Sequence, residues 1–199
     1  MVNEKQAQLI LRTNTRLFSA VFPFHGGELF LVADGESLKC VVYGHMTTLV
    51  DVIRPHCVPS ITAPLEESVN YFSSYFNDPF ASVDAPPLDL NGYTTIEKKV
   101  YQALLSIETG TTISYGELAI LSGIPGGARF VGNAMAKNRF PIIIPCHRVI
   151  KGDGSMGMYT SGAEMKKFLL DHEMSMHTHS QVSPQDENLD DIEKKFKLE

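Results

Sequence analysis

The stretch Pro141-Ile142-Ile143-Ile144-Pro145-Cys146-His147-Arg148-Val149 places a cysteine between an apolar run and two basic side chains. The run over 141–144 predicts a buried strand, and the proline after it, which has no amide hydrogen to donate, favours the end of that strand. Cys146 is then expected where a buried element reaches the surface. A thiol with the usual pKa of about 8.5 is only about 3% ionised at neutral pH, so a nucleophile here needs a base or a positive neighbour. His147 and Arg148 are the candidates, and the alternative is an inert buried cysteine.

Composition indicates a soluble globular protein. The chain has 199 residues, of which 43% are hydrophobic and 20% charged, enough for one large or two small domains. No apolar run approaches the ~18 residues of a membrane span, and the N-terminus lacks the apolar stretch of a signal peptide. The three cysteines have no paired spacing, which favours a reducing compartment. We therefore expect an intracellular protein without membrane contact.

Charge is distributed unevenly along the chain. The formal net charge is -6, which argues against a polyanionic partner. Residues 1–97 carry 5 basic and 11 acidic groups, whereas residues 98–151 carry 7 basic and 2 acidic groups. The cysteine lies in this basic block. Because local potential governs contact with phosphates, an acidic protein with one basic face can still bind nucleic acid.

The N-terminal part is expected to be a small α+β domain over residues 1–90. Short β-branched and aromatic runs at 17–22, 28–33 and 38–43, separated by glycine-containing turns, predict consecutive antiparallel strands. From Pro64, apolar residues at spacings of four, three and four predict a helix that ends before Asp78. Residues 78–93 contain prolines, aspartates and an Asn-Gly pair, which predicts a linker.

The N-terminal part also contains a possible zinc set of two cysteines and two histidines, namely Cys40, His45, His56 and Cys57. Their spacing fits no common zinc pattern, and the adjacent pair is an awkward chelate. We expect no metal and no cofactor.

The C-terminal part, residues 91–176, is expected to be mostly helical. A helix is predicted over 96–107, and Ser114-Tyr115-Gly116-Glu117 has the pattern of a capping box that opens a short helix up to Leu121. A second helix is predicted from Pro125 to Ala136, which makes a helix-turn-helix. Three glycines in that helix would each cost about 1 kcal/mol relative to alanine. Either close packing on the core or close approach to a DNA groove would explain them.

The Pro-Cys-His-Arg-Val sequence after three isoleucines resembles the active-site signature of the O6-alkylguanine-DNA alkyltransferases. The resemblance extends over about Ile96 to Glu173, with the elements in the family's order. It implies direct, irreversible transfer of the alkyl group from O6-alkylguanine, and from O4-alkylthymine, in double-stranded DNA to Cys146. Because a stacked base cannot be attacked in line, base flipping is implied as well. Each molecule would react once.

Particular residues take roles by the same resemblance. Cys146 would be the nucleophile, with His147 as its base and Glu173 and Asn138 in support. The DNA-binding residues would be Tyr115, which crowds the phosphate, Arg129, which fills the stack, and Ala128, Gly132 and Arg148. The guanine pocket would consist of Met135, Val149, Tyr159 and Thr160. The chain departs from the family at Tyr159-Thr160-Ser161-Gly162, where a second glycine is often found, and this predicts a stiffer loop.

Two other functions are compatible with parts of the sequence. One is a module that binds alkylated bases without chemistry, which the presence of Cys146 disfavours. The other is a thiol hydrolase with a Cys-His-Glu site, which the basic helix-turn-helix disfavours. We expect a monomer that is nuclear in a eukaryote and otherwise cytoplasmic, with a flexible acidic tail over 177–199.

Overall fold

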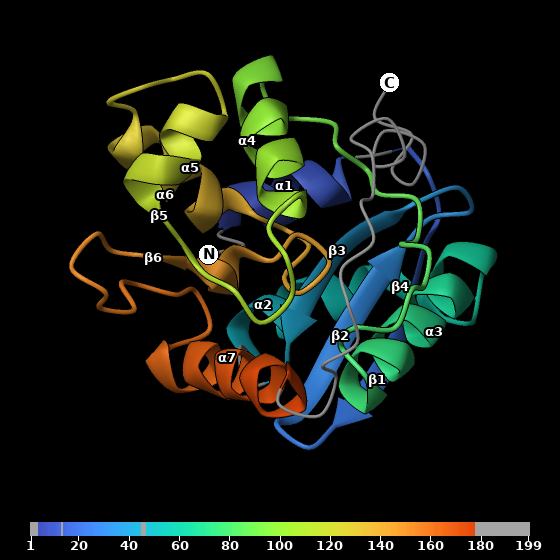
Figure 1. Ribbon diagram of the computed structural model, residues 1–199. Helices are drawn as coiled ribbons and strands as arrows, with labels where there is room; N and C mark the ends of the chain where they lie inside the picture. The colour runs from blue at the N-terminus through green and yellow to red at the C-terminus, as the bar shows by residue number, and fades with distance from the viewer. Residues whose placement is uncertain (1–3, 13, 45–46, 178–199) are drawn as a thin grey trace.

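The computed structural model describes residues 4–12, 14–44 and 47–177 of the chain, shown in Figure 1. In these ranges the elements follow in the order α1 (Glu4–Leu11), β1 (Leu17–Phe24), β2 (Gly27–Ala33), β3 (Leu38–Tyr43), α2 (Thr47–Ile53), the 3-10 turn η1 (Arg54–His56), β4 (Cys57–Pro59), α3 (Ala63–Asn77), α4 (Thr95–Leu105), β5 (Ile113–Ser114), α5 (Tyr115–Leu121), α6 (Ala128–Lys137), the 3-10 turn η2 (Cys146–Arg148), β6 (Val149–Ile150) and α7 (Ala163–His177). The fold is α+β, as expected. The predicted tail falls almost wholly outside the described residues.

The N-terminal sheet has the strand order β3-β2-β1-β4. The three predicted strands are present, and β1–β2 and β2–β3 pair antiparallel. The short strand β4 was not expected. It pairs parallel to β1, with Leu17 opposite Cys57, so the sheet is mixed rather than antiparallel throughout.

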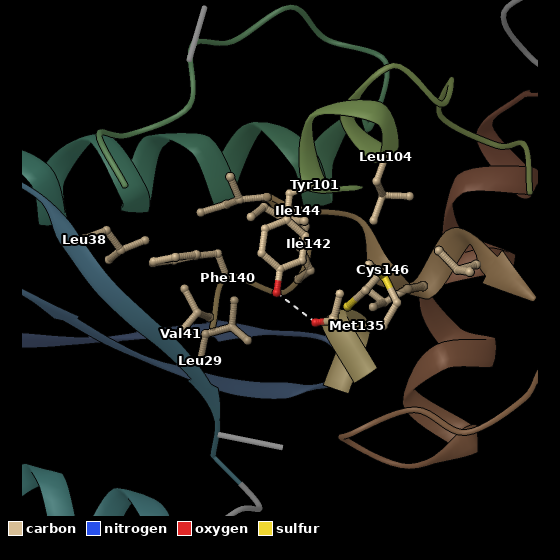
Figure 2. Packing of buried hydrophobic residues seen from close by; sticks show 14 of the residues in the cluster. Leu29, Leu38, Val41, Tyr101, Leu104, Met135, Phe140, Ile142, Ile144 and Cys146 are labelled. Atoms are coloured by element: carbon tan, nitrogen blue, oxygen red, sulfur yellow. Dashed lines mark hydrogen bonds between the residues drawn. The ribbon is translucent and has the colours of Figure 1, made fainter. Parts of the chain in front are cut away.

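Both faces of the sheet are covered, which explains why β2 and β3 contain long buried runs instead of alternating ones. One face packs under α1 and α2, with Ile10 and Ile53 among its buried residues. The other face belongs to a larger cluster that includes Leu29, Val41 and Cys146. Figure 2 shows this cluster continuing from the strands, past Phe140 and Tyr101, to Met135 and Cys146. The cysteine therefore lies at the end of a core that the sheet and the C-terminal helices share.

The linker segment is held against the sheet. As expected, residues 78–93 contain neither a helix nor a full strand, only an isolated bridge between Leu38 and Leu88. The ammonium of Lys39 lies 2.6 Å from Asp34 and 3.1 Å from Asp89, and all three side chains are buried. These contacts fix the segment that leads into α4. The domain boundary near residue 90 stays a prediction.

Helices α5 and α6 pack against each other, and the capping box that opens α5 is present. Ser114 accepts from the amide of Glu117 at 3.2 Å, and Glu117 accepts from the amide of Ser114 at 2.9 Å. The expected start of α6 was wrong, because the helix begins at Ala128. Gly126 has a φ of +81°, and a Cβ at Gly127 would lie 2.7 Å from a backbone oxygen. Two of the three glycines therefore form the turn, and their helix penalty does not arise.

The isoleucine run before the cysteine is a turn and not the predicted strand. Ile142 has a φ of +74°, which a β-branched residue rarely adopts, and the amide of Ile144 donates to the oxygen of Phe140 at 2.8 Å. All three isoleucines are buried. Periodicity could not distinguish this turn from a strand, because each residue of a tight buried turn can be apolar.

Candidate active site

Cys146 begins the turn η2 and is 7% exposed. Its sulfur accepts a hydrogen bond from Nδ2 of Asn138 at 3.1 Å. Asn138 follows directly after α6, and its side chain also donates to the oxygen of Ile144 at 2.8 Å and accepts from the amide of Phe140 at 2.9 Å. One amide group therefore ties the end of α6 to the turn that carries the thiol. Asn138 was expected to support His147, but in the structure its side chain contacts the sulfur of Cys146 instead.

His147 points into the interior, where both it and Glu173 are fully buried. Nε2 of His147 lies 2.7 Å from Oε1 of Glu173 on α7. A carboxylate can only accept, so Nε2 carries the proton and Nδ1 of the neutral ring is left as an acceptor. Nδ1 is buried and has no hydrogen-bond partner among the described residues. The ring therefore has one unused basic nitrogen.

Glu173 receives hydrogen bonds from four residues. Besides His147, Tyr75 of α3 donates its hydroxyl at 2.9 Å, the amide of Gly110 donates at 3.0 Å, and Arg148 donates from its guanidinium. Burial alone would raise the pKa of this carboxyl, but the hydrogen bond from His147 and the hydrogen bonds and charge of Arg148 hold it well below its usual range. Glu173 therefore stays ionised beside the histidine.

Arg148 does not lie where the DNA-binding expectation put it. It is 8% exposed, and its guanidinium contacts Glu173 at 3.0 Å, the oxygen of Ile107 at 2.7 Å and the hydroxyl of Thr109 at 2.9 Å. These bonds occupy N–H donors of the guanidinium with acceptors inside the protein. Arg148 thus neutralises Glu173 and holds the segment after α4, and it does not face a groove. It is not the positive neighbour of the thiol either.

The electrostatic environment opposes ionisation of the thiol. Burial raises the pKa of Cys146, while hydrogen bonds from Asn138 and Tyr159 and the charge of Lys166 lower it in part. Burial also lowers the pKa of His147, against the opposing effect of Glu173. At neutral pH Cys146 is therefore a thiol and His147 a neutral imidazole.

A small pocket opens beside the sulfur. Among the expected pocket residues, Met135, Tyr159 and Thr160 line it together with Cys146 and Asn138. Val149 does not, because it is fully buried in β6, opposite Ile113 of β5. Sequence reasoning missed the remaining lining residues, which are Val41, Val42, Tyr43, Pro141 and Ser161. No local pattern in β3 signals that this strand reaches a cysteine a hundred residues away.

The pocket is nearly closed, with a volume of about 20 Å³, room for about one water molecule. The hydroxyls of Tyr43 and Tyr159 lie 3.3 Å apart across it. Lys166, fully buried on α7, donates from Nζ to the oxygen of Val149 at 2.5 Å and to the oxygen of Met156. Burial lowers the pKa of Lys166 to about 8. The lysine thereby anchors the loop between β6 and α7 that covers the cysteine.

The exposed face of α6 is formed by small or polar residues. Arg129, Asn133 and Ala136 are exposed, and Ala128 and Gly132 are half-buried. Tyr115 lies at the start of α5, and a Cβ at Gly132 would lie 3.9 Å from its ring. A side chain at position 132 would thus make only ordinary van der Waals contact with Tyr115, so packing does not require a glycine there. The expected DNA-binding residues other than Arg148 lie together on this side of α5 and α6.

The possible zinc set is not assembled. No group of three potential metal ligands occurs within the described residues, and His45 lies outside them. Cys40 is fully buried, which raises its pKa to about 12, and Cys57 lies in β4 with its pKa raised to about 11 by burial. Within the described ranges, no helix has both the length and the apolar character needed to cross a bilayer.

Residues 95–175 match the model of the 6-O-methylguanine DNA methyltransferase DNA-binding domain. The chain is 36% identical over 126 residues to the methylated-DNA--protein-cysteine methyltransferase of Mus musculus, an alignment that covers 60% of this chain but only 58% of that protein. It is 41% identical over 122 residues to the protein of the same name from Mycobacterium bovis, covering 61% of this chain and 72% of that one.

The fold is similar as well. The crystal structure of Mycobacterium tuberculosis OGT in complex with DNA matches with a TM-score of 0.69 and 34% identity, over 80% of this chain and 94% of that one. The turn with Cys146, the paired His147 and Glu173 and the helices α5 and α6 all lie within the matched domain. The chain therefore belongs to the methylated-DNA--protein-cysteine methyltransferase family.

Proposed function

We propose that this protein repairs double-stranded DNA by moving the alkyl group of O6-alkylguanine, and of O4-alkylthymine, onto the sulfur of Cys146. The observation that carries the proposal is the placement of one thiol in a pocket beside a histidine with an unused buried nitrogen. Membership of the family supports the same reaction.

The chemistry uses groups that are already in place. Nδ1 of His147 accepts the thiol proton, directly or through a water, and Glu173 stabilises the resulting imidazolium through Nε2. The thiolate then attacks the alkyl carbon, a sulfur–carbon bond forms, and the carbon–oxygen bond breaks with its electrons left on the guanine. In the net reaction the thiol proton passes to the guanine. The 3.1 Å hydrogen bond from Nδ2 of Asn138 holds the sulfur in position during the attack.

The base must leave the duplex to reach the sulfur, because Cys146 is buried. The exposed face of α6 is narrow and suits the minor groove, where small side chains allow close approach. Arg129 projects from the first turn of that helix and would fill the gap in the stack. Tyr115 would press on the phosphate beside the rotated nucleotide. The helix pair α5–α6 thus acts as a helix-turn-helix, and the protein acts as a monomer.

The test uses the full chain and a duplex with a single O6-methylguanine. After incubation, mass spectrometry of peptides from the protein should find one added methyl group, located on Cys146. A duplex with ordinary guanine serves as the control and should add nothing. Binding without any mass change would overturn transfer in favour of a module that only binds alkylated bases.

A further inference from the structure

The pocket cannot hold a guanine in the conformation described. Its volume of about 20 Å³ takes roughly one water molecule, so part of the wall must move before a base enters. The part of the wall that belongs to a loop is the segment 158–161, which lies between Gly157 at a φ of +68° and Gly162 at +90°. Tyr159 belongs to this segment and lines the pocket together with Cys146.

The pocket wall opposite this segment belongs to a strand and not to a loop. Tyr43 is 2% exposed and is the last residue of β3, where it pairs with Leu29 of β2. Val41 lies two residues earlier, on the same face of the sheet, in the same buried cluster. Because the strand is locked in a ladder of backbone hydrogen bonds, this wall stays in place when the loop opens.

The two walls meet directly next to the reacting atom. Tyr159, Tyr43 and Cys146 line the same small pocket, and the hydroxyls of Tyr159 and Tyr43 lie 3.3 Å apart. Because Asn138 already bonds to the sulfur, an alkyl carbon would reach the sulfur from the pocket that Tyr159 and Tyr43 line. Any further atoms of the alkyl group would then extend toward the ring of Tyr43.

We propose that Tyr43 is a specificity-determining residue that limits the size of the alkyl group accepted at Cys146. The inference rests on the proposed alkyl transfer. It assigns a part of the substrate site to the N-terminal sheet, outside the matched DNA-binding domain. The aromatic ring is the part that acts, because the ring forms the wall of the pocket, whereas the hydroxyl contacts Tyr159 of the opposite wall.

The test compares two duplexes of one sequence, carrying either O6-methylguanine or O6-benzylguanine, under single-turnover conditions. The measured quantity is the ratio of the benzyl rate to the methyl rate. Tyr43→Leu removes the ring, and we expect the ratio to rise about tenfold, the scale on which a pocket discriminates apolar groups. Tyr43→Phe keeps the ring, so the ratio should stay within about twofold of the unchanged protein.

The matched control is Val32→Ala, which removes volume from the opposite face of the same sheet. It should leave the ratio unchanged. An unaltered ratio in Tyr43→Leu, or an equal rise in Tyr43→Phe or Val32→Ala, would overturn the inference. If Tyr43→Leu does not fold, Tyr43→Met has the same expected direction, because its unbranched, flexible side chain adapts more easily to an irregular buried space. Failure of the unchanged protein to transfer methyl at all would instead refute the proposed function.

Discussion

Nε2 of His147 lies 2.7 Å from Oε1 of Glu173, and both side chains are fully buried. A buried carboxylate persists only with partners, and Glu173 has Arg148, Tyr75 and the amide of Gly110 in addition to the histidine. The same group of contacts links α3, the segment after α4, η2 and α7. The proposed base is thus oriented by residues that also hold the fold together.

Replacing this carboxylate should therefore affect stability as well as rate. Glu173→Gln leaves the guanidinium of Arg148 buried without its counter-charge, and we expect a loss of about 3–5 kcal/mol in the free energy of unfolding. Urea denaturation at neutral pH measures it. Glu164→Gln, an exposed site on the same helix, is the matched control and should change stability by less than about 0.5 kcal/mol. Equal effects at the two sites would contradict the assigned ion pair.

Acid should lower the stability of the folded protein through protonation of Glu173. The folded pKa of Glu173 lies below its unfolded value of about 4.3, so its stabilisation is complete above that value and is lost as pH falls through the folded pKa. We expect the urea concentration at the midpoint of unfolding to decrease as the pH is lowered below about 5. This decrease should be less steep in Glu173→Gln. Asp34 and Glu97 also have lowered pKa values and leave a residual slope in the variant. Parallel pH profiles would contradict the prediction.

Removing the nucleophile should separate binding from chemistry. Cys146→Ala is expected to abolish methyl transfer while it preserves binding to alkylated duplex DNA, because the loss of one sulfur leaves α6 intact. Mass spectrometry and a fluorescence binding titration measure the two properties. Cys57→Ser, whose side chain can still donate to the oxygen of Ile53, is the control and should remain active. Transfer that survives in Cys146→Ala would refute the assignment of the nucleophile.

Arg129 should matter only where there is a base stack to fill. We expect Arg129→Ala to slow repair of duplex DNA at least tenfold more than it slows reaction with free O6-benzylguanine. Single-turnover rates on both substrates test this, with Arg16→Ala as a control that removes an exposed arginine from the N-terminal part. Equal losses on both substrates would make Arg129 a structural residue.

Affinity for DNA should also fall with salt at a slope of about 0.9 per phosphate contacted.

Local sequence signals predicted much of this fold. The strands β1 to β3, the helix α3 and the capping box at Ser114 follow from alternation, apolar spacing and a side chain that caps its own helix. The helices α1 and α2 and the strand β4 were missed, because short elements get most of their stability from tertiary contacts. The strand expected before Cys146 was wrong for a related reason, since burial alone does not specify extended backbone.

The candidate site was predictable only in part. The cysteine, the histidine and Asn138 lie close in sequence, and the family resemblance supplied Glu173. The interior position of Arg148 and the contribution of Tyr75 and Tyr43 depend on segments that meet only in the folded chain. Charge counting placed Arg148 in a basic block, yet its guanidinium is used to neutralise Glu173. The net charge of a segment does not tell which of its charges reach the surface.

The last prediction concerns turnover. The proposed transfer makes a thioether on Cys146, and its carbon carries no polarised carbonyl that water could attack, unlike the acyl group of a thiol hydrolase intermediate. Around the sulfur, the described residues that line the pocket supply an amide, two phenols, two hydroxyls and apolar side chains, and none of these neutral groups is a nucleophile strong enough to displace an alkyl group from sulfur. Each molecule should therefore react once.

With alkylated DNA in excess, the amount of methyl transferred should reach a plateau at about one per protein, measured with a radiolabelled methyl group. The alkylated protein should stay inactive after the DNA is removed and fresh substrate is added. Sustained transfer of many methyl groups per Cys146 would contradict irreversible alkylation and favour the hydrolase.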